Sequence, residues 1–181
     1  MAWHNSPTRF GLVTRLLHWG MALAIIAMLA LGTRIADMQP GLANLWLYSL
    51  HKSIGLILLV LVLARLVWHR ISPPPAPQGT PGGWTIRLAR AAHTAFYLLL
   101  LGIPLSGWVA SSASGLDVML FDRWVIPAIA PVSEAWENAG WAVHGALTKV
   151  LMGLMLLHVA GALKREMDGD GTLRRMLRGH R

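Results

Sequence analysis

The stretch that decides the fold runs from Gly140 to Leu163 and reads GWAVHGALTKVLMGLMLLHVAGAL. It is long and apolar enough to cross a bilayer as one helix, which takes roughly 20 largely apolar residues. It contains His144 and His158. At about 100° per residue, these histidines lie on one helix face, offset by about 40°, with about 21 Å of rise between them. One spanning helix therefore places two ionisable side chains on the same face at two depths.

Three further stretches have the same apolar character, and the composition agrees with them. Of the 181 residues, 55% are hydrophobic and 13% are charged, which is too apolar for an ordinary soluble domain. We therefore predict an all-α integral membrane protein, a four-helix bundle that forms a single domain over residues 1–181. The predicted spans are residues 15–34, 45–68, 91–112 and 140–163.

The basic residues predict the orientation of this bundle. Lysine and arginine concentrate in the cytoplasmic loops of membrane proteins, and twelve of the sixteen basic residues fall on one side of the four spans. Both termini are therefore predicted to be cytoplasmic. The net charge of +8 would also suit a nucleic-acid partner, but this placement argues against one. The twelve are Arg9, Arg15, Arg65, Arg70, Arg87, Arg90, Lys164, Arg165, Arg174, Arg175, Arg178 and Arg181.

The first apolar run also allows a second interpretation, as a cleaved signal peptide. Ala30-Leu31-Gly32 resembles a small-x-small cleavage site. Residues 1–8, however, lack the basic segment that precedes such a run, and His18 inside it would have no purpose in a discarded peptide. A retained span is the better interpretation.

Histidine is the most informative residue type in this chain. There is no cysteine, which excludes thiolate metal sites and covalently attached c-type haem. His4 and His180 lie in the tails and His69 lies among arginines at the inner surface, so we expect these three to be solvated. An ionisable side chain inside a span is costly and indicates a functional site. The intramembrane histidines are His18, His51, His93, His144 and His158.

Alternating helix directions sort these five histidines into two layers. His51 and His144 begin their spans at the outer face, whereas the other three lie toward the inner face. A haem between helices needs an imidazole from each side, so an outer bis-histidine haem has only the pair His51 and His144 available. The inner layer offers His18, His93 and His158 for two positions, and spacing does not choose among them.

Other side chains in the spans have weaker interpretations. Met152 and Met155 are alternative axial ligands but are better explained as core residues. Lys149 lies deep in the fourth span, about 140° from the histidine face. Lys52, beside His51, would hold a haem propionate, attract an anion or extend toward water. Glycines leave room either for flat cofactors or for close helix approach, and the candidates are Gly20, Gly55, Gly145 and Gly153.

We expect the segments between the spans to connect the helices and not to contribute catalytic or ligand-binding residues. The link over residues 71–83 is rich in proline and ends in Gly82-Gly83, which is typical of an extended connector with a flexible joint. Pro104 is expected to kink the third span. Residues 168–171 are expected to form a turn. The outer loop over residues 113–139 is the longest and is the best candidate for a partner-facing surface.

Several motifs together carry a family resemblance. They are Leu16-Leu17-His18-Trp19, Leu50-His51-Lys52-Ser53-Ile54-Gly55, Arg65-Leu-Val-Trp68, His93 followed by Tyr97 and Gly102-Ile-Pro104-Leu-Ser106-Gly107, the His144/His158 pair, and Asp170-Gly-Thr172-Leu-Arg-Arg-Met176. From about Arg9 to Arg178 the chain resembles the bacterial cytochrome b561 family, which includes cytochrome b subunits of membrane hydrogenases and formate dehydrogenases.

The resemblance implies two haem b groups (protohaem IX) held by histidine ligands to iron. By position, it gives the outer haem His51 and His144 and the inner haem His18 and His158. His93 is left to line the inner haem or a quinone pocket. It also implies a multi-pass protein of the bacterial inner membrane, which passes electrons in a respiratory chain between ubiquinone or another quinone and a periplasmic donor or acceptor.

Three alternatives to this electron-transfer function stay open from the sequence. One is superoxide oxidation at the outer haem with reduction of ubiquinone, in which Lys52 is the candidate catalytic residue because it would attract the anion. A second is a cytochrome b anchor subunit of a dehydrogenase or hydrogenase. A third is a haem-free transporter. The sequence also leaves open whether the partner is a periplasmic redox protein or superoxide, and whether the chain forms a homodimer.

Overall fold

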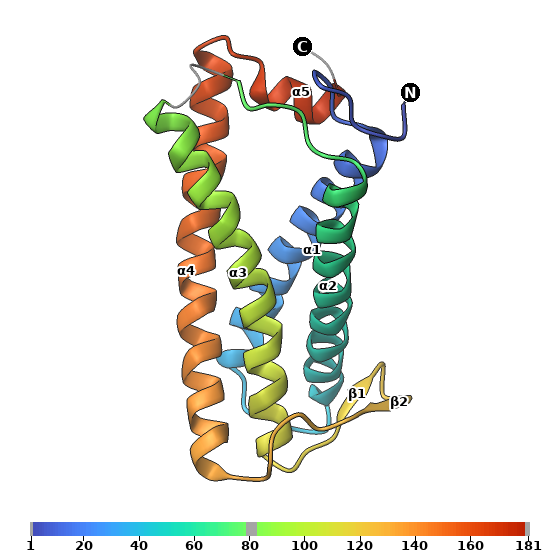
Figure 1. Ribbon diagram of the computed structural model, residues 1–181. Helices are drawn as coiled ribbons and strands as arrows, with labels where there is room; N and C mark the ends of the chain where they lie inside the picture. Colours follow the sequence, from blue (N-terminus) through green and yellow to red (C-terminus); the bar gives the residue numbers. More distant parts are fainter. Residues whose placement is uncertain (1, 79–82, 180–181) are drawn as a thin grey trace.

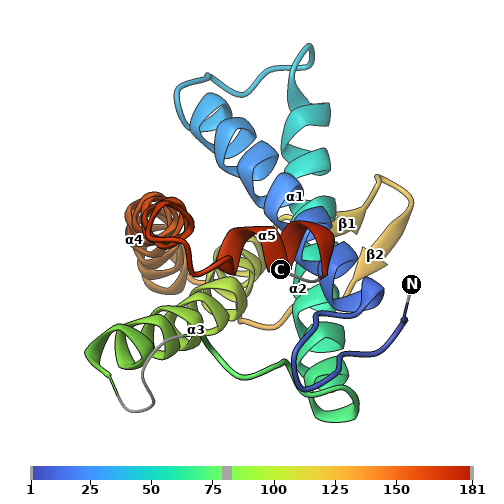
Figure 2. The ribbon, with the colours of Figure 1, turned by 90° about the horizontal axis from the view of Figure 1, so that it is seen from above.

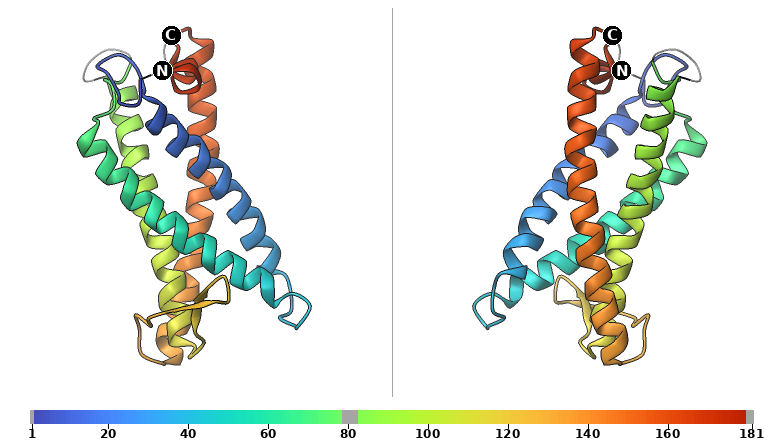
Figure 3. Two further views of the ribbon diagram at one scale, coloured as in Figure 1. Left: turned by 90° about the vertical axis from the view of Figure 1, so that its right-hand side faces the viewer. Right: turned by 90° about the vertical axis from the view of Figure 1, so that its left-hand side faces the viewer.

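Four long helices form the body of the protein. The computed structural model describes residues 2–78 and 83–179. Its long helices are α1 (Leu12–Ala36), α2 (Leu45–Ile71), α3 (Trp84–Ala113) and α4 (Glu134–Met167). Each predicted span lies within one of these helices, which confirms the prediction of a membrane four-helix bundle. Helix α1 lies beside α2, and α3 lies beside α4 (Figures 1 and 3).

Polar and apolar side chains are distributed in the opposite way to those of a soluble protein. Large apolar side chains such as Leu156 and Leu157 are 71% and 72% exposed, whereas Thr14, Ser53 and Ser111 are buried. An apolar surface of this extent would be unfavourable in water. In a bilayer it contacts lipid tails, and the buried hydroxyl groups form hydrogen bonds inside the bundle. All four helices are long and apolar enough to cross a membrane, so the chain is a multi-pass membrane protein.

Helices α3 and α4 form the most extensive contact in the bundle. They come very close at Gly140, where an added Cβ would lie 2.8 Å from the Cβ of Ala110 and 2.9 Å from its Cα and backbone nitrogen. Small residues of this kind let helix backbones come close together in membranes. Pro104 lies inside α3, and the helix continues past it to Ala113. The tight α3–α4 pair thereby fixes the position of the histidines on α4.

A small β-hairpin at the outer end of the bundle was not predicted from the sequence. Strands β1 (Val118–Leu120) and β2 (Trp124–Ile126) pair antiparallel within the long outer loop (Figure 1). The turn between them uses two residues with positive φ, Phe121 and Asp122. The hydroxyl of buried Ser53 accepts a hydrogen bond from the backbone nitrogen of Phe121 at 2.7 Å. This contact attaches the hairpin to α2, two residues from His51.

The opposite end, which we call the inner end, carries the start of α1 and the short helix α5 (Thr172–Arg178) (Figure 2). Arg15 on α1 donates hydrogen bonds to the carbonyls of Met176 and Leu177. The guanidinium of buried Arg175 lies 5.0 Å from the centre of the Phe10 ring and donates to the Ala76 carbonyl at 2.9 Å. These contacts hold α5 across the inner end. That this end faces the cytoplasm stays a prediction.

The connections at the inner end agree in part with the sequence. The expected turn at residues 168–171 joins α4 to α5 and is confirmed. In it, Asp170 accepts hydrogen bonds from Nε of Arg165 at 2.5 Å and from the backbone nitrogen of Thr172 at 2.8 Å. Burial acts to raise the pKa of Asp170, but these bonds outweigh it and lower the pKa below its usual range. The turn is therefore stabilised above the ordinary carboxyl pKa and loses that contribution in acid.

The proline-rich link follows α2 directly. Asn5 donates from its side-chain nitrogen to the Ser72 carbonyl at 2.7 Å, which attaches the start of the link to the N-terminal segment. The link over residues 71–83 includes residues 79–82, so Gly82 of the predicted flexible joint lies outside the described residues.

Replacing Gly140 with alanine tests the close α3–α4 contact. The new Cβ would overlap Ala110, and overpacking of this kind costs typically about 1–3 kcal/mol. We expect Gly140→Ala to lower the thermal unfolding midpoint in detergent. Gly161→Ala on the same helix is the matched control, because a Cβ there would meet nothing within 4 Å. Equal midpoints for the two variants would contradict the close contact.

Candidate functional site

The intramembrane histidines come together in two groups at different heights in the bundle. In the outer group, the ring centres of His51 on α2 and His144 on α4 lie 6.2 Å apart, with planes at 73°. In the inner group, the ring of His158 on α4 lies 6.3 Å from that of His18 on α1 and 5.7 Å from that of His93 on α3. Helix α4 therefore contributes one histidine to each group, as its spacing predicted.

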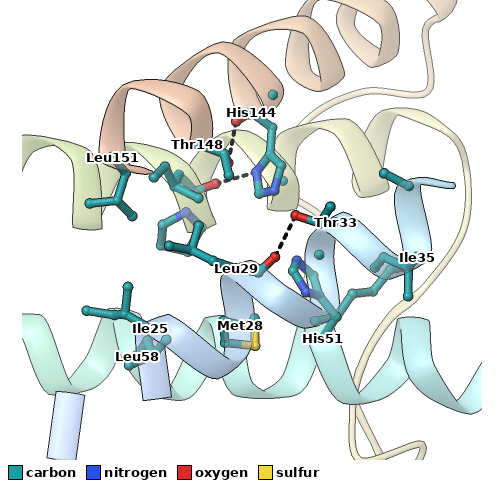
Figure 4. A pocket seen from close by; sticks show the side chains of 18 of the residues that line it. Ile25, Met28, Leu29, Thr33, Ile35, His51, Leu58, His144, Thr148 and Leu151 are labelled. Carbon is teal, nitrogen blue, oxygen red and sulfur yellow. Dashed lines mark hydrogen bonds between the residues drawn. The ribbon is translucent and has the colours of Figure 1, made fainter. Parts of the chain in front are cut away.

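The outer pair faces a cavity of about 540 Å³ that is lined by all four long helices. Figure 4 shows His51 and His144 entering this cavity from α2 and α4. Most of the remaining walls are apolar, which is typical of a site for a large, flat, mainly apolar cofactor. The apolar lining includes Ile25, Met28, Leu58, Leu100, Leu151 and Met152.

His144 is held in an orientation that suits a metal ligand. Its Nδ1 lies 2.8 Å from the carbonyl oxygen of Ile103, which can only accept, so Nδ1 carries the proton and donates it. Ser106 donates to the same carbonyl at 2.8 Å. In the neutral imidazole, Nε2 is then the free acceptor. Metal-binding histidines commonly donate their second ring nitrogen to a backbone carbonyl in this way.

His51 contributes an unpaired polar atom to the same cavity. Its Nδ1 is buried and has no hydrogen-bond partner among the described residues. A buried donor or acceptor without a partner costs about 1–3 kcal/mol. A bound group would remove that penalty only by contacting Nδ1 itself. The place of His51 in the cavity wall, opposite His144, is what supports a ligand-binding role for it.

Two glycines make room for these histidine rings, a role that was not predicted for either of them from the sequence. A Cβ at Gly107 would lie 3.0 Å from Nδ1 of His144, and a Cβ at Gly32 would lie 3.1 Å from Cε1 of His51. Of the four glycines considered from the sequence, Gly55 and Gly145 line the cavity. At Gly20, Gly145 and Gly153 a Cβ would meet nothing within 4 Å. The spacing of residues within one helix could not identify Gly32 or Gly107, because the rings that they contact belong to other helices.

Lys52 and Lys149, the lysines within the predicted spans, lie at the same cavity. Lys52 and Lys149 line the outer cavity together with Thr33 and Asp37. Helical periodicity placed Lys149 away from the face of α4 that carries the histidines. The cavity nevertheless reaches Lys149, because it covers more of the α4 surface than the histidine face alone. Met152 also borders the cavity, so its interpretation as a core residue alone is incomplete.

The inner group is surrounded by polar side chains from α2 and α3. A terminal guanidinium nitrogen of Arg65 lies 3.5 Å from Nδ1 of His18, and Nε of Arg65 donates to the Tyr97 hydroxyl at 3.2 Å. The Phe96 ring packs 5.1 Å from that of His158. Sequence reasoning assigned no role to Arg65 or Tyr97, because their partners are distant in the chain.

The expectation that His69 is solvated is wrong. This side chain is half-buried, and its Nδ1 lies 3.1 Å from the Tyr97 hydroxyl. The cause is the tertiary contact between α2 and α3, which brings Tyr97 against His69. His4 is exposed, as expected, and stacks on Trp68 with ring centres 5.0 Å apart. His180 lies outside the described residues.

The spacing of the rings fits a metal held between two imidazoles. A metal–nitrogen distance of about 2 Å on each side places the two ring centres about 6 Å apart. The outer spacing of 6.2 Å lies near this value, and so do both inner spacings, 6.3 Å for His18–His158 and 5.7 Å for His93–His158. A membrane helix bundle with facing histidines and a large apolar cavity defines the class of membrane b-type cytochromes.

Comparison with known proteins identifies the family within this class. The family model described as prokaryotic cytochrome b561 matches residues 9–179. This chain therefore belongs to the prokaryotic cytochrome b561 family, whose cofactor is haem b, and it is a multi-pass bacterial membrane protein.

Two relatives are similar over nearly their whole length. Cytochrome b561 homolog 2 of Escherichia coli (strain K12) is 35% identical over 181 residues, covering 98% of this chain and 95% of the relative. A protein named probable superoxide oxidase CybB, from Yersinia pestis, is 24% identical over 162 residues, covering 89% of this chain and 91% of the relative.

The close approach of Gly107 to His144 gives a direct test of the outer site. Gly107→Ala would press a methyl group against the imidazole and move it from its position. Disturbing the groups that orient a ligand typically weakens metal binding by about 10–100-fold. We expect Gly107→Ala to lose haem during purification, measured as pyridine haemochrome per protein. Gly153→Ala, where the space is open, serves as the control and should keep its full haem content.

Proposed function

We propose that this protein carries electrons across the bacterial inner membrane through two haem b groups, between a quinone and a donor or acceptor in the periplasm. The observation that carries the proposal is the pair of histidine groups at two heights in one bundle, with ring spacings of 6.2 Å in the outer group and 6.3 Å between His18 and His158. The histidines of α4 are about 21 Å apart along the helix. Two centres at this separation would connect the two faces of the membrane.

In this proposal, His51 and His144 hold the outer haem, and His18 and His158 hold the inner one. When bound, each haem supplies a one-electron redox centre, and two histidine ligands leave no open position for other chemistry. The chain orients the ligands, as Ile103 does for His144, and excludes water with the apolar cavity wall. His93 is assigned a position beside the inner haem rather than on its iron.

Several features of the wider arrangement belong to the same proposal. The whole chain acts as one membrane domain, and the inner end, with both termini, faces the cytoplasm. The distribution of basic residues supports this orientation. Lys52 and Lys149 border the outer cavity and would balance the negative charge of haem propionates there. The outer loop with the β-hairpin would face a periplasmic partner.

A second candidate function is oxidation of superoxide at the outer haem with reduction of ubiquinone. Two observations favour it: the similarity to a relative named probable superoxide oxidase, and the position of Lys52 at the cavity that holds His51 and His144. A cation at this place would attract a small anion to the outer site. In this function Lys52 guides the substrate, and the electron passes to the quinone by the same route.

The two-haem proposal predicts a specific pattern in reduced-minus-oxidised spectra. The purified protein should contain two haem b groups, and His51→Ala and His158→Ala should each remove a different one, because each substitution deletes a ligand of one pair. Pyridine haemochrome and α-band spectra measure this loss. His4→Ala is the control, since His4 is exposed and lies outside both groups. The proposal is falsified if the protein holds one haem or if both substitutions remove the same band.

Superoxide oxidation is tested separately by pulse radiolysis with ubiquinone present. Lys52→Glu should slow superoxide consumption by about tenfold or more and weaken its dependence on ionic strength, because it reverses a charge that steers the anion. Reduced spectra check that the haems are retained. If superoxide disappears no faster than in buffer, this second function is excluded and the electron-transfer proposal is unaffected.

A further inference from the structure

A series of hydrogen bonds connects α2 and α3 beside the inner histidine group. The proposed electron transfer assigns no role to these bonds. Nε of Arg65 donates to the Tyr97 hydroxyl at 3.2 Å, and this hydroxyl lies 3.1 Å from Nδ1 of His69. Arg65 also reaches to 3.5 Å from Nδ1 of His18. The series of hydrogen bonds therefore extends from the last turn of α2 to the inner histidines.

At the end of this series that lies nearest the inner surface, one nitrogen of His69 has no hydrogen-bond partner among the described residues. Nε2 of His69 is buried and has no hydrogen-bond partner among the described residues. In native proteins, an unpaired buried atom of this kind indicates a bound water or a role in chemistry. His69 lies in the last turn of α2, next to exposed Arg70. A water on Nε2 would join this series to the aqueous surface at the inner end.

Carboxylates, the other common proton carriers, are missing from this region. Helices α1, α2 and α3 contain no aspartate or glutamate. In α4, Glu134 and Glu137 lie in the first turn at the outer end, and Glu166 near the inner end pairs with Arg174 at 2.9 Å. In the inner halves of α2 and α3, the titratable side chains other than the arginines and His93 are therefore His69 and Tyr97.

The proposed function creates a need for such a path. Reducing a quinone to a quinol takes two electrons and two protons, and the hydrocarbon of a bilayer supplies no protons. We propose that His69 and Tyr97 pass protons from the inner aqueous surface to a quinone bound beside the inner histidine group, and that Arg65 positions Tyr97 for this transfer. This inference rests on the proposed electron transfer to a quinone, which supplies the two electrons.

The transfer balances at named atoms. A proton from water binds Nε2 of His69 while the proton on Nδ1 moves to the Tyr97 oxygen, and the original hydroxyl proton of Tyr97 goes to a carbonyl oxygen of the quinone. The guanidinium of Arg65 stabilises negative charge that develops on the Tyr97 oxygen. His69 is then protonated on Nε2 and accepts from Tyr97. When the ring turns from Tyr97 toward water, Nδ1 gains a proton and Nε2 releases one, which restores the first tautomer. Both tautomers fit the 3.1 Å contact. Two such transfers complete the quinol.

A stopped-flow experiment on the haem-loaded protein tests this path. The protein is reduced with dithionite, desalted without oxygen and mixed with ubiquinone-1 in H₂O or D₂O, and reoxidation is followed at the α-band. Because losing a positioned proton donor typically costs about 10²–10⁴-fold in rate, we expect Tyr97→Phe to slow reoxidation by about 10²-fold. The reduced spectrum should be unchanged. His69→Ala should be slowed in the same way and recover when imidazole is added.

The matched control is His4→Ala, an exposed histidine at the same end, which should keep the wild-type rate and solvent isotope effect. Recovery of His69→Ala with imidazole distinguishes proton transfer from a structural role, because a packing defect would not respond to a small base. Wild-type rates and isotope effects in both Tyr97→Phe and His69→Ala would overturn the path while the electron-transfer proposal stands. If the reduced wild-type protein does not react with ubiquinone-1 at all, the quinone proposal fails and the path fails with it.

Discussion

The structure depends on one constraint, the cost of placing polar groups in hydrocarbon. Backbone amides in the bilayer must be satisfied within the chain, so the protein crosses the membrane only as helices. The same cost applies to five imidazole rings, which the helices place in two groups instead of scattering them among lipid tails. In the outer group, the cost is met in part by the Ile103 carbonyl and in part left unmet at His51.

The packing of the bundle serves this arrangement. Gly140 brings α4 against α3, and Gly107 lets the His144 ring come close to α3, where its Nδ1 donates to the Ile103 carbonyl. At the outer end, the hairpin is fastened to α2 by Ser53, close to His51. At the inner end, α5 is held by Arg15 on α1. Each haem-ligand candidate therefore lies on a helix whose neighbouring contacts restrict its movement.

The two ends of the bundle differ in their chemistry, which fits a protein that connects two different reactions. The outer cavity combines the histidine pair with two lysines and suits an anionic or propionate-bearing group. The inner histidines instead adjoin the Arg65, Tyr97 and His69 chain, which contains no carboxylate and can pass protons. Electrons need only centres at suitable separation, whereas protons need an uninterrupted series of hydrogen bonds. The hydrogen bonds among Arg65, Tyr97 and His69 are the series that we propose for protons.

The sequence by itself determined the four helices, their alternating order and the two heights of the histidines, because hydrophobic length and the 3.6-residue period are local properties of the chain. It also left one possible outer pair, His51 with His144. Only the tertiary structure showed that His158 lies 6.3 Å from His18 and 5.7 Å from His93, that Gly32 and Gly107 make room for imidazoles, and that Lys149 borders the outer cavity. It likewise brought His69 from the surface into contact with Tyr97. These features depend on how helices rotate and pack against one another, and no periodicity within a single helix records that.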